Sequence, residues 1–373
     1  MAREEAVERF RTAFAEELHC RKMTELEEHV EREYEKIQAG IVESLRRLFA
    51  KIGSEGKEPG YITVSLLRTS LKFGEGRCLL SAYGDNLYLD NSPIEEYYDA
   101  GWLLSFLNEY GDALDAEIKK YVGKITRQDT EKIKWGKLCS YKSLLVLMFR
   151  KAIEQAIRLE EYAHIKISSL LDIRVGEYHG LSESIWVEEK MRMPEGDIKA
   201  LLEKKYEQEC MYRHYKDIDI SCGEYAGVNF TYSRFERVNL SGSAINGCIL
   251  SGTRFDACDM ERANLQGSTI WLGDFSRSSM KEANLSCVND GSELDVEKMD
   301  RKIFTRTSFR DVDLRGADLS GGDFTGCDFR GAELAGCNTE GAKLYKALIE
   351  GKYADDGGLA LTEEQRGEIS WTE

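Results

Sequence analysis

The sequence predicts an α+β domain over residues 1–210, an all-β solenoid over residues 211–351 and a capping segment over residues 352–373. Three observations predict this order. Apolar residues near the start of the chain recur at helical spacing, a large apolar residue returns every five positions from Ile220 onward, and a small residue stands two positions before most of these. A chain of 373 residues is long enough to build two separate cores.

The five-residue period is the strongest observation, because neither a helix nor a strand has it. A unit with one large and one small inward side chain fits a chain that turns a corner every five residues. Four such units close a coil of about 20 residues, and successive coils stack through ladder hydrogen bonds about 4.8 Å apart. The large residues are Ile220, Tyr225, Phe230, Phe235, Leu240, Ile245, Leu250, Phe255, Met260, Leu265, Ile270, Phe275, Met280 and Leu285, and the small ones include Ser243, Cys248, Thr253, Cys258, Ala263 and Ser268.

Three units show the repeat most plainly, namely Ala263-Asn264-Leu265, Ala283-Asn284-Leu285 and Ala317-Asp318-Leu319. They resemble the pentapeptide-repeat family, whose unit reads Ala-(Asp/Asn)-Leu-x-x. The resemblance covers residues 215–351 and implies a right-handed quadrilateral β-helix for this part of the chain. Some bacterial proteins of this family carry a fused N-terminal region, which the first 210 residues resemble without any motif that carries chemistry.

The period breaks at Asp290 and resumes at Phe304, which predicts an insertion over residues 290–303. With Phe304 in the open core position, the repeat makes about six coils at about 20 residues each. This register predicts an aromatic stack on one wall, made of Phe235, Phe255, Phe275, Phe309 and Phe329. We expect Phe255, Phe275, Leu265 and Leu319 to be nearly fully buried.

In residues 1–210 the pattern predicts helices and a small antiparallel sheet. Apolar spacing predicts one long helix over residues 2–52, or two with a break near Gly40. Strands are expected at 61–67, 77–83, 87–89 and 172–178, with Gly84-Asp85-Asn86 as a hairpin turn. Helices are expected over 93–122, starting at Ser92-Pro93, and over 129–163 and 195–209. Near the end, Thr362 and Gln365 form a capping-box pattern that predicts a short C-terminal helix carrying Trp371.

Composition limits the class of partner. The net charge is −16, spread over both halves of the chain, which argues against direct binding to nucleic-acid phosphates. The charged N-terminus and the lack of a long apolar run predict a cytoplasmic protein without a membrane segment. Ten cysteines without a CxxC pair are read as free thiols in a reducing compartment. We expect no cofactor and no metal, since Cys210, His214 and Cys222 lack the spacing of a zinc site.

Two surface features of the solenoid are candidate contact sites. Outward apolar residues on the wall of Phe230, Leu250 and Ile270 are candidate protein contacts, unless another part of the chain folds over them. The residue before each core position of another wall gives an acidic column, which suggests either DNA mimicry or the ordinary Asp/Asn position of the repeat. The apolar candidates are Tyr232, Ile249, Trp271, Leu272 and Tyr345, and the acidic candidates are Asp219, Asp259, Asp313 and Glu333.

These features favour a non-enzymatic interaction or scaffold protein that uses the walls and the insertion as a binding platform. A second hypothesis comes from the resemblance, because quinolone-resistance members of the family are acidic dimeric rods that look like DNA to gyrase and topoisomerase IV. It implies a type II topoisomerase as partner and admits a homodimer. A third hypothesis places an enzyme in residues 1–210, where Glu95, Glu96 and Asp99 are the candidate acids. No catalytic motif supports it, so we expect no enzymatic activity.

Overall fold

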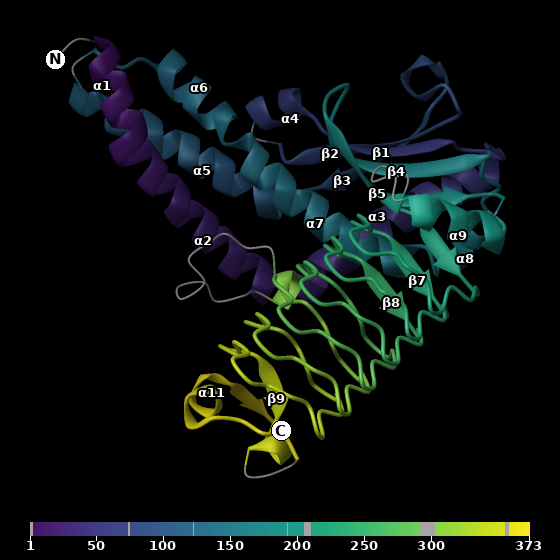
Figure 1. Ribbon diagram of the computed structural model, residues 1–373. Coiled ribbons are helices and arrows are strands. Elements are labelled where there is room, and N and C mark those ends of the chain that lie inside the picture. Colours follow the sequence, from purple (N-terminus) through teal and green to yellow (C-terminus); the bar gives the residue numbers. More distant parts are fainter. Residues whose placement is uncertain are drawn as a thin grey trace. The chain divides into compact units, whose positions relative to one another are not determined.

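The computed structural model describes residues 3–73, 75–121, 123–191, 193–204, 210–290, 303–354 and 358–373. The chain forms two compact units, the head (residues 1–190) and the solenoid unit (residues 191–373). Figure 1 shows the helices and the sheet of the head in purple to teal and the stacked coils of the solenoid unit in green to yellow.

The helices of the head follow the apolar spacing, with different boundaries. The predicted helix over 2–52 is interrupted at Glu33, whose backbone leaves the helical region, whereas Gly40 lies inside α3. A π-helical turn over Arg11–Ala15 separates the first two helices. The helices are α1 (Arg3–Phe10), α2 (Glu16–Arg32), α3 (Tyr34–Glu55), α4 (Arg68–Lys72), α5 (Gly101–Glu117), α6 (Arg127–Gly136), α7 (Leu138–Ala156) and α8 (Glu160–Ala163).

A five-stranded sheet in the order β3-β2-β1-β4-β5 lies against these helices. Its strands are β1 (Tyr61–Leu66), β2 (Arg77–Tyr83), β3 (Ile94–Asp99), β4 (Leu170–Glu177) and β5 (Ser182–Glu189). Strands β1 and β4 are parallel and the other neighbours antiparallel, so the sheet is mixed, not purely antiparallel as expected. Helices α3 and α7 pack against each other and against the sheet.

Two predictions around residue 90 are wrong, and Asp90 gives the reason. Its carboxylate accepts the backbone N–H groups of Gly84 and Ser92 and pairs with Lys57 at 2.6 Å. These bonds hold the connection as a loop with a 3-10 turn over Leu87–Leu89, where a strand was expected. The strand that pairs with β2 is therefore β3, and Pro93 precedes a strand instead of opening a helix.

The coils of the solenoid unit stack through parallel bridges between residues 20 positions apart, such as Asn239 with Asp259. Across the insertion the offset becomes 34, as in the bridge of Asp274 with Ser308. The difference of 14 is the insertion length that the repeat predicts. The ladder contains strands of three residues at β6 (His214–Lys216), β7 (Arg234–Glu236), β8 (Arg254–Asp256) and β9 (Leu348–Glu350).

The register differs from the expected one at a single core position. Asn289 bridges Thr269, and the backbone N–H of Ile270 donates to Asn289 O at 2.7 Å. Asp290, and not Phe304, therefore follows in register above Ile270. Phe304 is buried in a 3-10 turn over Ile303–Thr305, and the ladder resumes at Ser308. Residues 291–302, on which the rest of the insertion prediction falls, lie outside the described residues.

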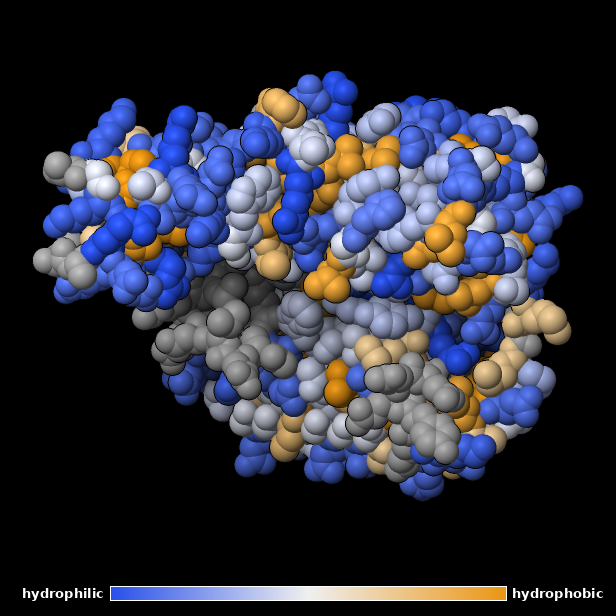
Figure 2. Space-filling model, turned by 90° about the horizontal axis from the view of Figure 1, so that it is seen from above, coloured by the Kyte–Doolittle hydropathy of each residue, from blue (hydrophilic) through white to orange (hydrophobic). Residues whose placement is uncertain are grey.

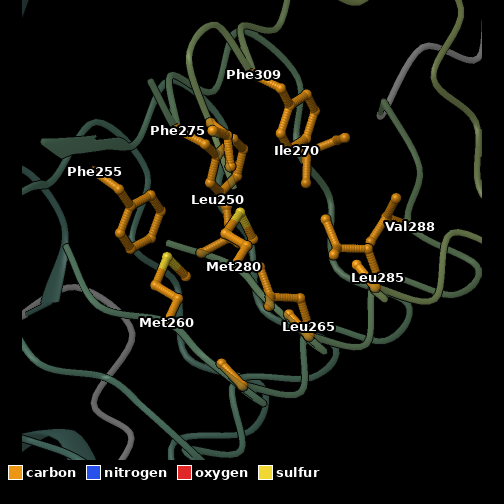
Figure 3. Close-up of a cluster of buried hydrophobic side chains, with 14 of the residues drawn as sticks. Leu250, Phe255, Met260, Leu265, Ile270, Phe275, Met280, Leu285, Val288 and Phe309 are labelled. Carbon is orange, nitrogen blue, oxygen red and sulfur yellow. The ribbon is translucent and has the colours of Figure 1, made fainter. Parts of the chain in front are cut away.

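The interior of the coils is apolar, as predicted, and Figure 3 shows its labelled side chains filling the space between the walls. Phe255, Phe275, Leu265 and Leu319 are all at most 2% exposed. The aromatic stack is confirmed, with ring centroids 4.7 to 5.1 Å apart and interplanar angles of 4 to 12° from Phe235 to Phe329. Tyr215 extends it by one ring that the periodic series did not include.

The small inward side chains donate hydrogen bonds to the preceding coil. The hydroxyl of Ser243 donates to Ile220 O at 2.9 Å, and that of Thr253 donates to Phe230 O at 2.8 Å. The thiols of Cys248 and Cys337 donate to carbonyls in the same way. Serine, threonine and cysteine therefore fit here both because they are small and because each satisfies a buried carbonyl oxygen.

Both ends of the solenoid are capped from within the same unit. Helix α9 (Glu195–Lys204) contributes Ile198, Leu201 and Leu202 to the core of the coils. At the other end, α11 (Glu363–Glu368) opens with the expected capping box, and the buried Gln365 amide donates to Thr339 O and Ala342 O. Trp371 lies on strand β10 (Ser370–Thr372) instead of a helix, and β10 pairs in parallel with β9. These caps cover the coil edges that would otherwise leave unpaired strand groups.

Candidate interaction surfaces

The four predicted acidic residues lie in one unbroken ladder column. Bridges connect Asp219, Asn239, Asp259, Ser279, Asp313 and Glu333 in that order. Two of the six positions are neutral, so the negative charge is interrupted. Two of the acids are also paired, Asp313 with Arg315 at 2.6 Å and Glu333 with Lys352 at 3.3 Å.

The Asp/Asn position of the repeat has a structural task in this column and elsewhere. Its side-chain oxygen accepts the backbone N–H two residues later, which closes the corner of the coil. Asp219 accepts from Ser221 at 2.9 Å and Asp259 from Glu261 at 3.0 Å. The hydrogen bond from Ser221 lowers the pKa of Asp219, and the one from Arg315 lowers the pKa of Asp313. Neutral Asn264 and Asn284 form the same bond, so the position selects a side-chain oxygen and not a charge.

The predicted apolar residues lie on another wall and divide into two groups. Ile249 is 42% exposed and Trp271 is 37% exposed, and they come from adjacent coils, since Ile249 bridges Thr269. Tyr232 is half-buried and stacks against Tyr212 at 5.7 Å. Leu272 is only 5% exposed, which differs from the outward position expected for it.

Tyr345 does not join this group. It is half-buried in a later coil, where its carbonyl accepts from Gly326 as that of Trp271 accepts from Gly252. Tyr345 therefore occupies the same position in its coil as Trp271 does, several coils later. The contact group that remains on this wall, hereafter the apolar wall, consists of Tyr232, Ile249 and Trp271.

A buried polar cluster in the head was not foreseen from the sequence. His19 of α2 lies against the rings of Tyr110 and Tyr141, with centroids 5.7 and 5.9 Å away, and its Nε2 is 3.3 Å from Ser140 Oγ. Burial lowers the pKa of His19, and burial raises the pKa of both tyrosines. These residues come from three helices, so no local pattern brings them together.

The candidate acids of the head are placed on a strand. Glu95, Glu96 and Asp99 belong to β3, where Glu96 pairs with Lys51 at 2.8 Å and with Arg47 at 3.4 Å. Lys51 also donates to the carbonyl of Glu95, so side chains of α3 cover this edge of the sheet. Glu96 therefore holds α3 against β3, whereas Asp99 accepts the backbone N–H of Gly101 at 2.8 Å.

Cys210, His214 and Cys222, which lack the spacing of a zinc site, also differ in exposure and in contacts. Cys210 is buried, Cys222 is exposed, and His214 is exposed and faces Glu236 at 3.1 Å. Among the residues that the structure describes, none of the His, Cys, Asp or Glu side chains form a group of three able to hold a metal ion. Within the same residues, the helices are too short or too polar to cross a membrane.

Comparison with known proteins identifies the repeat. A family model described as pentapeptide repeats matches in eight copies over residues 226–262, 258–289 and 307–344, and the gap between the last two contains the insertion. The comparison with curated proteins gave no match.

Several solved structures align with part of the chain. A pentapeptide repeat protein of the Arabidopsis thaliana thylakoid lumen is 18% identical over 30% of this chain and 66% of its own, with a TM-score of 0.22. QnrB1, a plasmid-mediated fluoroquinolone resistance protein, is 14% identical over 43% of this chain and 84% of its own, with a TM-score of 0.24. HetL of Nostoc sp. strain PCC 7120, involved in heterocyst differentiation regulation, is 14% identical over 45% and 100%, with a TM-score of 0.14. These scores are too low for an argument from any single structure.

Proposed function

Residues 226–289 and 307–344 are pentapeptide repeats, and from this premise we propose that the chain is a non-enzymatic scaffold whose solenoid binds a protein partner. The proposal takes the solenoid as a right-handed, four-walled β-helix of about six coils, with the insertion at 290–303 as an additional contact loop. Its free thiols fit a reducing compartment, so we place the protein in the cytoplasm.

The exposure of Ile249 and Trp271 carries the proposal. They are the large hydrophobic residues that the described coils expose, and both lie on the apolar wall. Each coil is hydrogen-bonded to the coil before it and to the coil after it, so the backbone cannot rearrange to bury these two side chains. Rigid exposed aromatic and aliphatic side chains are the usual anchors of protein interfaces, where tryptophan and tyrosine are enriched.

An enzymatic head is a weaker explanation of the same structure. His19 is the histidine of the head whose pKa is lowered, and burial is the first cause of that shift. With 8% exposure, the ring is packed among tyrosines of the helical core. A core histidine of this kind is explained by packing, whereas general acid–base catalysis needs a group within reach of a substrate.

A topoisomerase modulator that mimics DNA is the second candidate, and the unbroken ladder column of Asp219, Asp259, Asp313 and Glu333 supports it. A DNA mimic needs a continuous negative stripe, whereas this column contains Asn239 and Ser279 and has Arg315 and Lys352 beside it. The closing of coil corners accounts for the acids without mimicry. We therefore rank DNA mimicry below a protein contact through the apolar wall.

Affinity capture with matched variants tests the proposal. The full chain, Trp271→Glu and Asp259→Asn are used as baits at equal concentration, with melting temperatures to confirm folding. We expect a partner that the wild type and Asp259→Asn retain and Trp271→Glu loses. Loss with Asp259→Asn alone would favour the acidic column, and direct competition with DNA for purified gyrase would then test mimicry. Equal capture by all three baits would contradict a role of either wall.

A further inference from the structure

The five-stranded sheet of the head has two faces of different character. Helices α3 and α7 pack against one face (Figure 1), where Val64, Leu80 and Ile173 are completely buried. Side chains alternate between the two faces along a strand, and residues that are partners in the sheet register share a face. The second face is mostly polar, and the register aligns four of its residues in one row, namely Ser81, Thr63, Arg174 and Ser184.

Much of this second face is buried, although the solvated face of a sheet is usually the polar one. Ser81 and Thr63 are buried, and Asp172, in the next row, is only 8% exposed. Buried polar groups need hydrogen-bond partners. The group that matters for binding, hereafter the polar face, consists of Thr63, Ser81, Asp172, Arg174, Ser182 and Ser184.

One oxygen of the polar face has no donor. Asp172 Oδ2 accepts from Arg174 Nη1 at 2.6 Å and from Ser184 Oγ at 3.1 Å. Ser182 also holds Arg174, because its hydroxyl accepts from Nε at 3.0 Å and its carbonyl accepts from Nη2 at 2.7 Å. Asp172 Oδ1 is buried, and none of the described residues donates to it. A buried acceptor without a donor is costly, so Oδ1 marks a place where a donor from outside the chain can bind.

Two aromatic rings from separate loops meet beside the polar face. Tyr88, in the 3-10 turn between β2 and β3, stacks on His179, in the turn between β4 and β5, with ring centroids 4.2 Å apart. Tyr88 also meets Tyr83 edge-on at 5.5 Å, and the register places Tyr83 in the row of Asp172. Burial raises the pKa of Tyr88 and the charge of Arg174 opposes this shift, so Tyr88 and Arg174 lie near each other.

The two turns combine a strained backbone with unpacked tips. Leu87 and His179 are the non-glycine residues with positive φ in the described part of the head, at 46° and 52°. Strain of this kind persists where the surrounding structure enforces it, and it clusters at ligand clamps. Leu89 and Leu181, beside the ring pair, are largely exposed, so both tips can part without breaking a packed core. In the view from above, Figure 2 shows apolar residues (orange) among the hydrophilic ones at the surface.

The groups on the polar face select the chemistry of a ligand. A carboxylate oxygen only accepts, so the ligand supplies a donor to Asp172 Oδ1, whereas the hydroxyls of Ser81 and Ser184 can donate or accept. Asp172 and Arg174 neutralise each other, so a charged ligand would lack a counter-charge at a buried site. The rings of Tyr88 and His179 offer flat faces to a flat ligand. An uncharged ring that carries several hydroxyls meets all three conditions.

We propose that the polar face binds the hydroxyl-bearing ring of an uncharged sugar, free or within a nucleoside, and that the Tyr88–His179 pair parts to admit it. Asp172 Oδ1 accepts a hydroxyl of the ring, and the two aromatic side chains cover it. The inference lies beyond the proposed function, because it concerns the head alone.

Isothermal titration calorimetry of the full chain tests this with D-ribose, D-glucose and adenosine. Each probe is added to about 10 mM, which detects dissociation constants in the millimolar range or below. Tyr88→Ala removes one ring, and Asp172→Asn replaces an accepting oxygen by an amide group. Tyr97→Ala is the matched control, since Tyr97 lies on the same side of the sheet, opposite Leu79 at the edge strand β3. Melting temperatures confirm that each variant is folded.

We expect the wild type to bind at least one probe, and both Tyr88→Ala and Asp172→Asn to weaken that binding about tenfold or more. Tyr97→Ala should bind like the wild type. Binding of ribose or glucose assigns the site to a free sugar, and binding of adenosine alone assigns it to a nucleoside. The inference is overturned if none of the probes binds, in which case Asp172 Oδ1 faces an interior water. It is also overturned if Tyr88→Ala or Asp172→Asn, once folded, binds as tightly as the wild type, or if Tyr97→Ala weakens binding equally.

Discussion

Phe255 lies between Phe235 and Phe275, with ring centroids 4.7 and 5.1 Å away, and only 1% of it is exposed. Truncation to alanine removes its transfer free energy and leaves a cavity that rigid coils cannot close. We expect Phe255→Ala to lower the free energy of unfolding by roughly 3–5 kcal/mol, measured by urea denaturation. Gln266→Ala, at an exposed position of the next wall, should stay within about 0.5 kcal/mol. A loss below 1 kcal/mol at Phe255 would contradict the packing of the column.

The cysteines separate into two groups by burial. Cys20, Cys139, Cys222 and Cys287 are exposed, and the other six are buried. Burial raises the pKa of Cys78, Cys258 and Cys337 to about 12, so their thiolate forms are scarce at neutral pH. We expect an aromatic disulfide reagent at pH 8 to modify four thiols rapidly in the native protein and all ten in denaturant. Rapid reaction of Cys258 in the native state, located by peptide mapping, would contradict its inward position.

At the scale of elements, prediction succeeded where a pattern repeats and failed where one distant contact decides. The five-residue period predicted the aromatic column and the insertion length, because the same spacing of large and small residues recurs in every coil. The segment at 84–93 contains a turn sequence and a capping sequence that are locally sound. The ion pair of Asp90 with Lys57 and the pairing of β3 with β2 override both. Strand β5 and the cluster around His19 likewise depend on residues far apart in the chain, which no local pattern reveals.

The insertion provides a test of register at the same scale. Deletion of residues 290–303 would join Asn289 to Phe304 and restore the 20-residue offset, with Phe304 in register above Ile270. We expect this variant to fold with a melting temperature within a few degrees of the wild type, followed by circular dichroism. Deletion of residues 290–302 leaves one residue more than the 20-residue offset, and this residue has to bulge out of the corner if Phe309 and the later core residues are to stay inward. We expect this variant to melt at a lower temperature than the first deletion. Equal melting of the two deletions would contradict the ladder.

For the whole molecule, the caps determine which part of the chain folds alone. The sequence pattern starts the solenoid at residue 211, whereas Ile198, Leu201 and Leu202 of α9 are buried in the same core as Tyr215 and Ile220. Removing α9 uncovers the first coil and forfeits three buried side chains at roughly 1.5–3 kcal/mol each. Since both caps belong to residues 191–373, the head is not needed to cover either end.

We therefore expect residues 191–373, expressed without the head, to give a soluble protein with one cooperative thermal transition. Residues 211–373 should melt at a markedly lower temperature or aggregate, because the open coil exposes apolar side chains and unpaired strand groups. Differential scanning calorimetry of both fragments measures the difference. Ile198→Asp within residues 191–373 should reproduce most of the loss, since it disrupts the cap without shortening the chain. If residues 191–373 fail to fold while the full chain does, the head supplies stability that the caps do not explain.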